Sequence, residues 1–81
     1  AIRNFYLQIL TGDRVDNIPG LVGIGPVKAN KILEDCVTED ELFNAVSKKY
    51  KHDTDKITER ARLLWIRRQE NELWEPPLYL Q

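Results

Sequence analysis

The sequence predicts an all-α protein, a small helical domain with an extended C-terminal tail. Apolar residues recur at helical spacing in four separate segments, and no segment alternates as a half-buried strand would. Glycines and prolines gather between the first two of these segments, which indicates a turn that joins two helices. Two consecutive prolines, Pro76 and Pro77, exclude a helix near the end of the chain.

The first predicted helix is followed by a loop and a second helix. Its apolar positions are Ile2, Phe5, Tyr6, Ile9 and Leu10. Gly12 suits the position just past its end, and residues 13–25 have the composition of a loop. Pro26 fits the first turn of the second helix, where its missing N–H costs nothing. The apolar side of that helix is formed by Ala29, Ile32 and Leu33.

Two further helices are predicted in the second half. Thr38 followed by Glu41 forms a capping box at the start of the third helix. Its buried side comprises Leu42, Phe43, Val46 and Tyr50. The fourth helix is expected to start near Asp53 or Asp55. It is expected to bury Ile57, Ala61, Leu64 and Trp65. The tail that follows contains Trp74, Leu78, Tyr79 and Leu80, which are expected to pack on the helices or on a neighbouring part of the protein.

Length and composition indicate one small soluble globular domain, which could be a piece of a larger protein. The chain has 81 residues, of which 42% are hydrophobic and 31% charged. Its apolar runs are far shorter than the roughly 18 residues needed to cross a membrane. Cys36 is the single cysteine, so an intrachain disulfide is excluded. We expect a reduced cytoplasmic protein without a membrane partner, with Cys36 as a small buried hydrophobic residue.

The net charge of −1 conceals a basic second half. Basic residues between 48 and 68 are Lys48, Lys49, Lys51, Lys56, Arg60, Arg62, Arg67 and Arg68. The acidic residues in the same segment are Asp53, Asp55 and Glu59. This excess suggests an anionic partner, although a solvated helix face is the commoner explanation of such a charge pattern.

The segment from Ile18 to Ala29, IPGLVGIGPVKA, predicts a phosphate site. Gly23 and Gly25 allow a positive φ and a close approach to the backbone. Free amides at the start of the following helix, together with its dipole, attract anions. Lys28 and Lys31 flank that end and can reach phosphate oxygens. We expect binding of nucleic acid without sequence preference and with strong salt dependence; the alternative is a glycine turn that only lets two helices meet.

Asp13 and Asp16 lie beside this turn, at the unfavourable C-terminal end of a helix. Two carboxylates there imply a compensating cation, either Arg14 or a divalent ion such as magnesium. A metal between acid and phosphate would let the two anionic groups coexist. Aspartates that form turns or cap helices are the commoner explanation, and both interpretations remain open at this point.

Residues 10–29, LTGDRVDNIPGLVGIGPVKA, resemble the helix-hairpin-helix region of the 5′-nuclease superfamily. This superfamily includes phage 5′→3′ exonucleases, flap endonucleases and the 5′-nuclease domains of bacterial DNA polymerase I. The resemblance implies a metal-dependent phosphodiesterase that acts on DNA with a 5′ end or flap. It implies that Asp13 and Asp16 are metal ligands for Mg²⁺ or Mn²⁺ and that Gly23 and Gly25 hold duplex phosphates.

The resemblance also implies a potassium ion on the carbonyls of Val22 and Ile24. Many relatives have lysine where this chain has Val27, so a phosphate contact is expected to shift to Lys28. The other acidic ligands of the family and its catalytic basic residues lie N-terminal to this motif and are absent from these 81 residues. His52 is expected to be a surface residue with no catalytic role.

We therefore expect residues 1–81 to form a single C-terminal helical DNA-binding domain of a 5′ nuclease, with the hairpin motif at about residues 11–35. Its expected partners are duplex or 5′-flap DNA and an N-terminal nuclease core of the same protein. The isolated chain is expected to bind DNA weakly and to cleave nothing. The alternative is a non-catalytic helix-hairpin-helix module of a repair or recombination protein.

Overall fold

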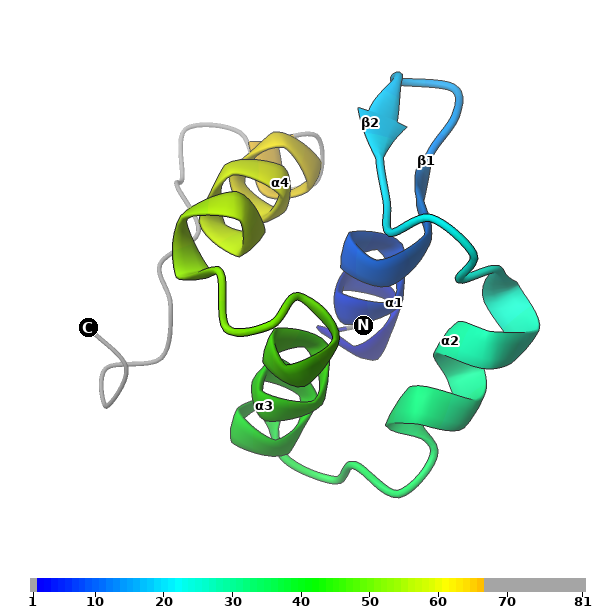
Figure 1. Cartoon of the computed structure of the whole chain (residues 1–81), viewed down its shortest axis with the longest axis vertical. Helices are drawn as coiled ribbons and strands as arrows, with labels where there is room; N and C mark the ends of the chain where they lie inside the picture. Colours follow the sequence, from blue (N-terminus) through cyan, green and yellow to red (C-terminus); the bar gives the residue numbers. More distant parts are fainter. Residues whose placement is uncertain (1, 67–81) are drawn as a thin grey trace.

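A computed structural model of the chain describes residues 2–66 and contains four helices. These are α1 (Ile2–Thr11), α2 (Pro26–Leu33), α3 (Glu39–Lys49) and α4 (Thr54–Ile66). Helix α1 is central and packs against each of the other three (Figure 1). The all-α prediction is confirmed. The predicted C-terminal tail, together with Arg67 and Arg68, lies outside the described residues.

The core forms where the apolar sides of the four helices meet. Its buried hydrophobic members are Phe5, Tyr6, Ile9, Leu10, Ile18, Ala29, Leu33, Leu42, Phe43, Val46, Tyr50, Ile57, Ala61 and Leu64. Edge-to-face aromatic contacts link three helices, because the ring of Phe5 lies 5.0 Å from that of Trp65 and the ring of Tyr6 lies 6.5 Å from that of Phe43. Helical periodicity therefore identified most of the buried positions, although Ile32 and Trp65 are only partly buried and Ile2 is exposed.

The predicted loop 13–25 contains a short antiparallel strand pair, which the sequence analysis did not predict. Strand β1 (Gly12–Asp13) pairs with β2 (Ile18–Pro19), so that Gly12 lies opposite Pro19. Strands of two residues are too short to show the alternation by which strands are recognised. Gly12 has a φ of +80° and turns the chain sharply away from the end of α1.

Local signals set the ends of α2 and α3 as predicted. Pro26 begins α2, with Gly25 in extended conformation as the N-cap residue. Thr38 caps α3 in a complete capping box, in which its hydroxyl accepts from the Glu41 amide and the Glu41 carboxylate accepts from the Thr38 amide. The C-terminal end of α2 is capped from a distance, since Arg3 Nη2 donates to the Leu33 carbonyl at 2.7 Å.

The connection between α3 and α4 is a tight turn. Lys51 and His52 both have positive φ angles, 55° and 62°, which non-glycine residues rarely adopt. The His52 amide donates to the Ser47 carbonyl at 2.8 Å and fixes the turn at the end of α3. Asp53 then caps α4 by accepting from the Lys56 amide, so the predicted helix start near Asp53 is confirmed. His52 is exposed, as predicted.

Within residues 2–66, no helix has the length and apolar character needed to cross a membrane.

Candidate nucleic-acid interface

A tight turn at residues 21–24 forms the tip of the segment between β2 and α2. The Ile24 amide donates to the Leu21 carbonyl at 3.3 Å, and Gly23 between them has a φ of +83°. A positive φ at the third residue is the mark of a type II turn, which explains the glycine. Gly25 has a φ of −91°, so of the two glycines that allow a positive φ only Gly23 adopts one. Gly25 serves instead as the extended N-cap of α2.

The four glycines of the chain divide into two pairs by the space around them. A side chain on Gly20 would lie 2.3 Å from the backbone of Thr11, and one on Gly12 would lie 2.5 Å from the backbone of Ile18. A side chain on Gly23 or Gly25 would meet nothing within 4 Å. The fold therefore requires Gly12 and Gly20 for close packing, whereas the backbone at Gly23 and Gly25 lies open to an approaching molecule.

The start of α2 presents amides and cations to solvent. The first intrahelical bond runs from the Ala29 amide to the Gly25 carbonyl at 2.9 Å. Helix geometry leaves the amides of Val27 and Lys28, which precede it, without an intrahelical acceptor. Lys28 and Lys31 are both exposed. This end of α2 has the polarity to attract an anion.

Asp13 forms an Asx turn and leads into the loop between the two strands. Its Oδ1 accepts from the amides of Val15 at 3.0 Å and Asp16 at 3.4 Å. The turn-forming interpretation of Asp13 therefore holds. Asn17 completes the loop with a φ of +56°, and its amide donates to the Arg14 carbonyl. Its contribution to the turn is a left-handed backbone.

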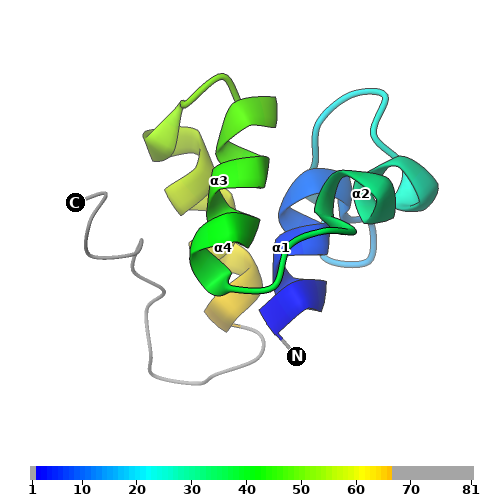
Figure 2. The same cartoon turned by 90° about the horizontal axis from the view of Figure 1, so that it is seen from below.

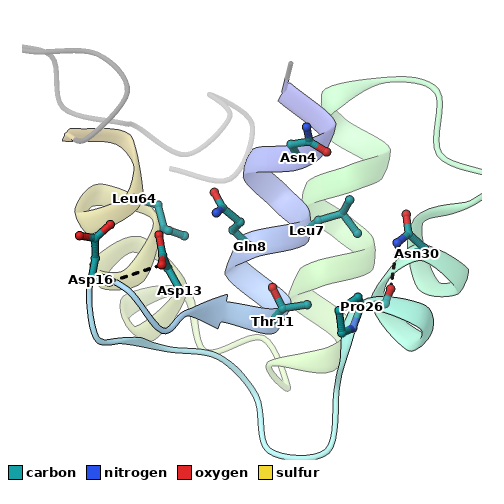
Figure 3. A pocket seen from close by; sticks show the side chains of 9 residues that line it. All are labelled: Asn4, Leu7, Gln8, Thr11, Asp13, Asp16, Pro26, Asn30 and Leu64. Atoms are coloured by element: carbon teal, nitrogen blue, oxygen red, sulfur yellow. Dashed lines mark hydrogen bonds between the residues drawn. The ribbon is translucent and has the colours of Figure 1, made fainter.

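One pocket joins the aspartates to the start of α2. It has a volume of about 580 Å³. Its lining residues are Asn4, Leu7, Gln8, Thr11, Asp13, Asp16, Pro26, Asn30 and Leu64. Figure 3 shows the two aspartates on one side and Pro26 with Asn30 on the other, with residues of α1 between them. The aspartates therefore share a pocket with Pro26 and Asn30 of α2, whereas Gly23, Gly25, Lys28 and Lys31 do not line it.

The carboxylates of this pocket fit part of a magnesium site. Mg²⁺ is usually held by one or two carboxylates and completes its shell with waters and phosphate oxygens. Asp13 and Asp16, both half-buried, could supply such a pair. Over residues 2–66, no cluster of three or more histidine, cysteine or acidic side chains is placed to hold a metal ion. Further protein ligands, if the metal uses them, would have to come from another part of the protein.

The basic second half gathers at the connection between α3 and α4. Lys48, Lys49, Lys51 and Lys56 are all exposed around it. Figure 2 shows this connection at the top of the view, at the same end of the molecule as the segment between β2 and α2. The exposed lysines and the glycine turn therefore occupy one end of the domain.

Several residues near the site were not singled out from the sequence. Asn4 and Gln8 lie four residues apart on α1, and both line the pocket. Their helical spacing on one face was the available signal. Arg60 was counted among the basic residues of the second half, but its contact with the Gly20 carbonyl could not be foreseen. Cys36 packs partly buried against the core, and burial raises the pKa of its thiol, which disfavours a reactive thiolate.

Comparison with known proteins finds short similarities to DNA polymerase I. The chain is 51% identical to the enzyme of Rhizobium leguminosarum over 37 residues and 47% identical to that of Deinococcus radiodurans over 38 residues. It is 42% identical to the enzyme of Caldicellulosiruptor bescii over 41 residues. These matches cover 46–51% of this chain but only 4–5% of the relatives. No family model matches, and no solved structure matches significantly.

Proposed function

We propose that this chain is the DNA-binding part of a metal-dependent 5′→3′ exonuclease or flap endonuclease. The observation that carries the proposal is the shared pocket, which Asp13 and Asp16 border together with the first turn of α2. A phosphate bound at the start of α2 would then lie across this pocket from carboxylates suited to a metal. The similarity to DNA polymerase I supports a role on DNA within a larger protein.

The DNA backbone would be held by main-chain amides and lysines. A Cβ at Gly23 or Gly25 would meet nothing within 4 Å, so the backbone there is open to a phosphate, and Lys28 and Lys31 add exposed positive charge beside it. Such contacts carry no base information, so binding is independent of sequence and weakens steeply as salt rises. In this arrangement a potassium ion would bind the carbonyls of Val22 and Ile24, at the tip that we propose to be a helix-hairpin-helix.

Asp13 and Asp16 would hold Mg²⁺ or Mn²⁺ at the edge of the pocket. Such an ion polarises a phosphate oxygen and lowers the pKa of a bound water. The Asx turn fixes the orientation of the Asp13 carboxylate, because two backbone amides engage Oδ1. The remaining ligands and the catalytic basic groups would belong to an N-terminal nuclease core of the same protein, so this chain alone should bind DNA and cleave nothing.

A second candidate is a non-catalytic helix-hairpin-helix module of a repair or recombination protein. The open glycine turn and the lysines favour it equally, since they serve binding alone. It explains Asp13 by its Asx turn and assigns the two carboxylates no metal. The two candidates therefore differ in what the aspartates do.

The test is the substitution of Asp13→Asn and Asp16→Asn, alone and together, in the intact protein that carries this segment. Asparagine keeps the acceptor oxygen of the Asx turn and removes the charge, so the loop should persist. A nuclease should lose turnover in magnesium while it binds duplex DNA as tightly or more tightly. If the double variant hydrolysed DNA at the unsubstituted rate, the metal-site role of the aspartates would be rejected. The non-catalytic binding module would then be the remaining candidate.

A further inference from the structure

Arg60 of α4 contacts the base of the glycine segment. Its Nη1 donates to the main-chain carbonyl of Gly20 at 3.3 Å and to the hydroxyl of Tyr50 at 3.0 Å. Its guanidinium carbon also lies 5.4 Å from the centre of the Tyr50 ring. A single side chain thus links α4 both to the segment before the turn and to the end of α3.

The contacts of Arg60 continue to the C-terminal end of α1. The Tyr50 hydroxyl donates to the Ile9 carbonyl at 2.6 Å, and the Leu21 amide donates to the Leu10 carbonyl at 2.9 Å. The carbonyls of Ile9 and Leu10, in the last turn of α1, therefore both have hydrogen-bond donors from outside the helix. Gly20 directly precedes Leu21. The carbonyl that Arg60 binds and the amide that bonds Leu10 therefore belong to the same peptide group, at the base of the turn.

The chemistry of arginine suits this place. Its planar guanidinium can bond two acceptors and lie against an aromatic ring at the same time, which a lysine ammonium does less well. Its charge also lies near the carbonyl end of α1, the negative end of a helix dipole. Both features favour arginine over other cations at this position.

We propose that Arg60 is a positioning residue, which holds the turn at residues 21–24 and the start of α2 at a fixed angle to the core. The DNA-binding consequence rests on the proposed function above, whereas the positioning itself does not. Arg60 acts through the Gly20 carbonyl and the Leu21 amide. It is distinct from Lys28 and Lys31, which would contact phosphate directly.

The first experiment measures amide hydrogen exchange in the full chain without DNA. We compare Arg60→Lys and Arg60→Gln with Lys56→Gln, which removes an exposed charge one turn earlier on the same helix. Loss of a hydrogen bond to a charged donor should speed exchange of the Leu21 amide about 10-fold in both Arg60 variants. Exchange in the interior of α1 and throughout Lys56→Gln should stay unchanged.

Two outcomes of this experiment would overturn the proposal. One is an unchanged Leu21 exchange rate in Arg60→Gln. The other is an equal acceleration of every core amide, since that would mean that Arg60 only adds to global stability. Arg60→Lys is included in case Arg60→Gln does not fold, because lysine keeps the charge and most of the side chain.

The second experiment measures duplex DNA binding against salt concentration. A positioning role predicts affinity about 10-fold lower in both Arg60 variants, with the slope of log affinity against log salt unchanged. A direct phosphate contact would instead lower that slope by about 0.9 in Arg60→Gln and leave it unchanged in Arg60→Lys. If the unsubstituted chain bound no DNA, the proposed function would fail, and the exchange experiment would still decide the role of Arg60.

Discussion

The hydroxyl of Tyr50, at the end of α3, donates a 2.6 Å hydrogen bond to the main-chain carbonyl of Ile9, 41 residues earlier in the chain. Burial raises the pKa of Tyr50, while the hydrogen bond and charge of Arg60 oppose that rise. The hydroxyl thus stays protonated and donates to a carbonyl that α1 itself cannot satisfy. This bond joins the first and third helices at the level where the glycine segment leaves the core.

Replacement of Tyr50 by phenylalanine should lower the free energy of unfolding by about 1–2 kcal/mol, because the buried Ile9 carbonyl loses its donor. Tyr6→Phe is the matched control. The Tyr6 hydroxyl donates to the carboxylate of Glu39, which is exposed and can be rehydrated. The Tyr6 variant should therefore lose less stability. Urea denaturation of both variants would measure the difference, and equal losses would contradict the role assigned to Tyr50.

Alanine substitutions at Gly20 and Gly25 should separate folding from binding. Gly20→Ala places a methyl group 2.3 Å from the Thr11 backbone, so it should cost about 2 kcal/mol or more. Gly25→Ala meets open space and changes only an N-cap residue, with a cost below about 1 kcal/mol. It should nevertheless weaken DNA binding several-fold by obstructing the backbone. Thermal unfolding would measure the stability of both variants, and a titration with duplex DNA would measure their affinity. Undiminished DNA affinity of Gly25→Ala would contradict a contact between DNA and the backbone at Gly25.

The capping box of α3 should make stability depend on pH in the acidic range. Hydrogen bonds from the amides of Thr38 and Val37 lower the pKa of Glu41 from its ordinary value of 4.5. A lowered pKa in the folded state means that this contribution is complete above about 4.5 and is lost as the pH falls through the folded pKa. Glu41→Gln keeps an acceptor but cannot titrate.

Denaturation of the unsubstituted chain and of Glu41→Gln at pH values on both sides of 4.5 would test this. The stability difference between them should be largest at neutral pH and should shrink in acid. A difference that grows as the pH falls would have the opposite sign and would exclude the capping explanation.

The lysines around the connection between α3 and α4 should contribute to DNA affinity through charge. Substitution of Lys48, Lys49 and Lys51 by glutamine should reduce the slope of log affinity against log salt by about 0.9 for each phosphate that is no longer neutralised. Arginine at the same three positions is the control and should preserve the slope. If the glutamine variant kept the full slope, these lysines would not contact DNA. They would then form a solvated helix face, which is the alternative explanation of the charge pattern.

The sequence predicted the helices well because their determinants are local. Apolar spacing placed the buried residues, Pro26 marked the start of α2, and Thr38 with Glu41 marked the start of α3. The strand pair escaped prediction because two-residue strands have no measurable period. Glycine allows both signs of φ, so the sequence could not show that Gly23 would adopt a positive φ and Gly25 an extended conformation.

The candidate site was predicted in its parts but not in its assembly. Asp13 and Asp16 were singled out as candidates from their spacing, and the start of α2 was predicted from its glycines and proline. Their common pocket depends on residues of α1, such as Gln8, which carry no motif. The contact between Arg60 and Gly20 spans 40 residues, and periodicity contains no information about such long-range pairs.

The capping of α2 by Arg3 has a mechanical consequence. Arg3, in the first turn of α1, donates to the carbonyl of Leu33 at the far end of α2, while the Leu21 amide ties the segment before α2 to the last turn of α1. The far end of α2 and the segment that leads into α2 are therefore both hydrogen-bonded to α1. A displacement of residues 21–24 would therefore have to move α1 and α2 with their buried side chains. The turn should resist bending even though no other part of the described chain covers Gly23.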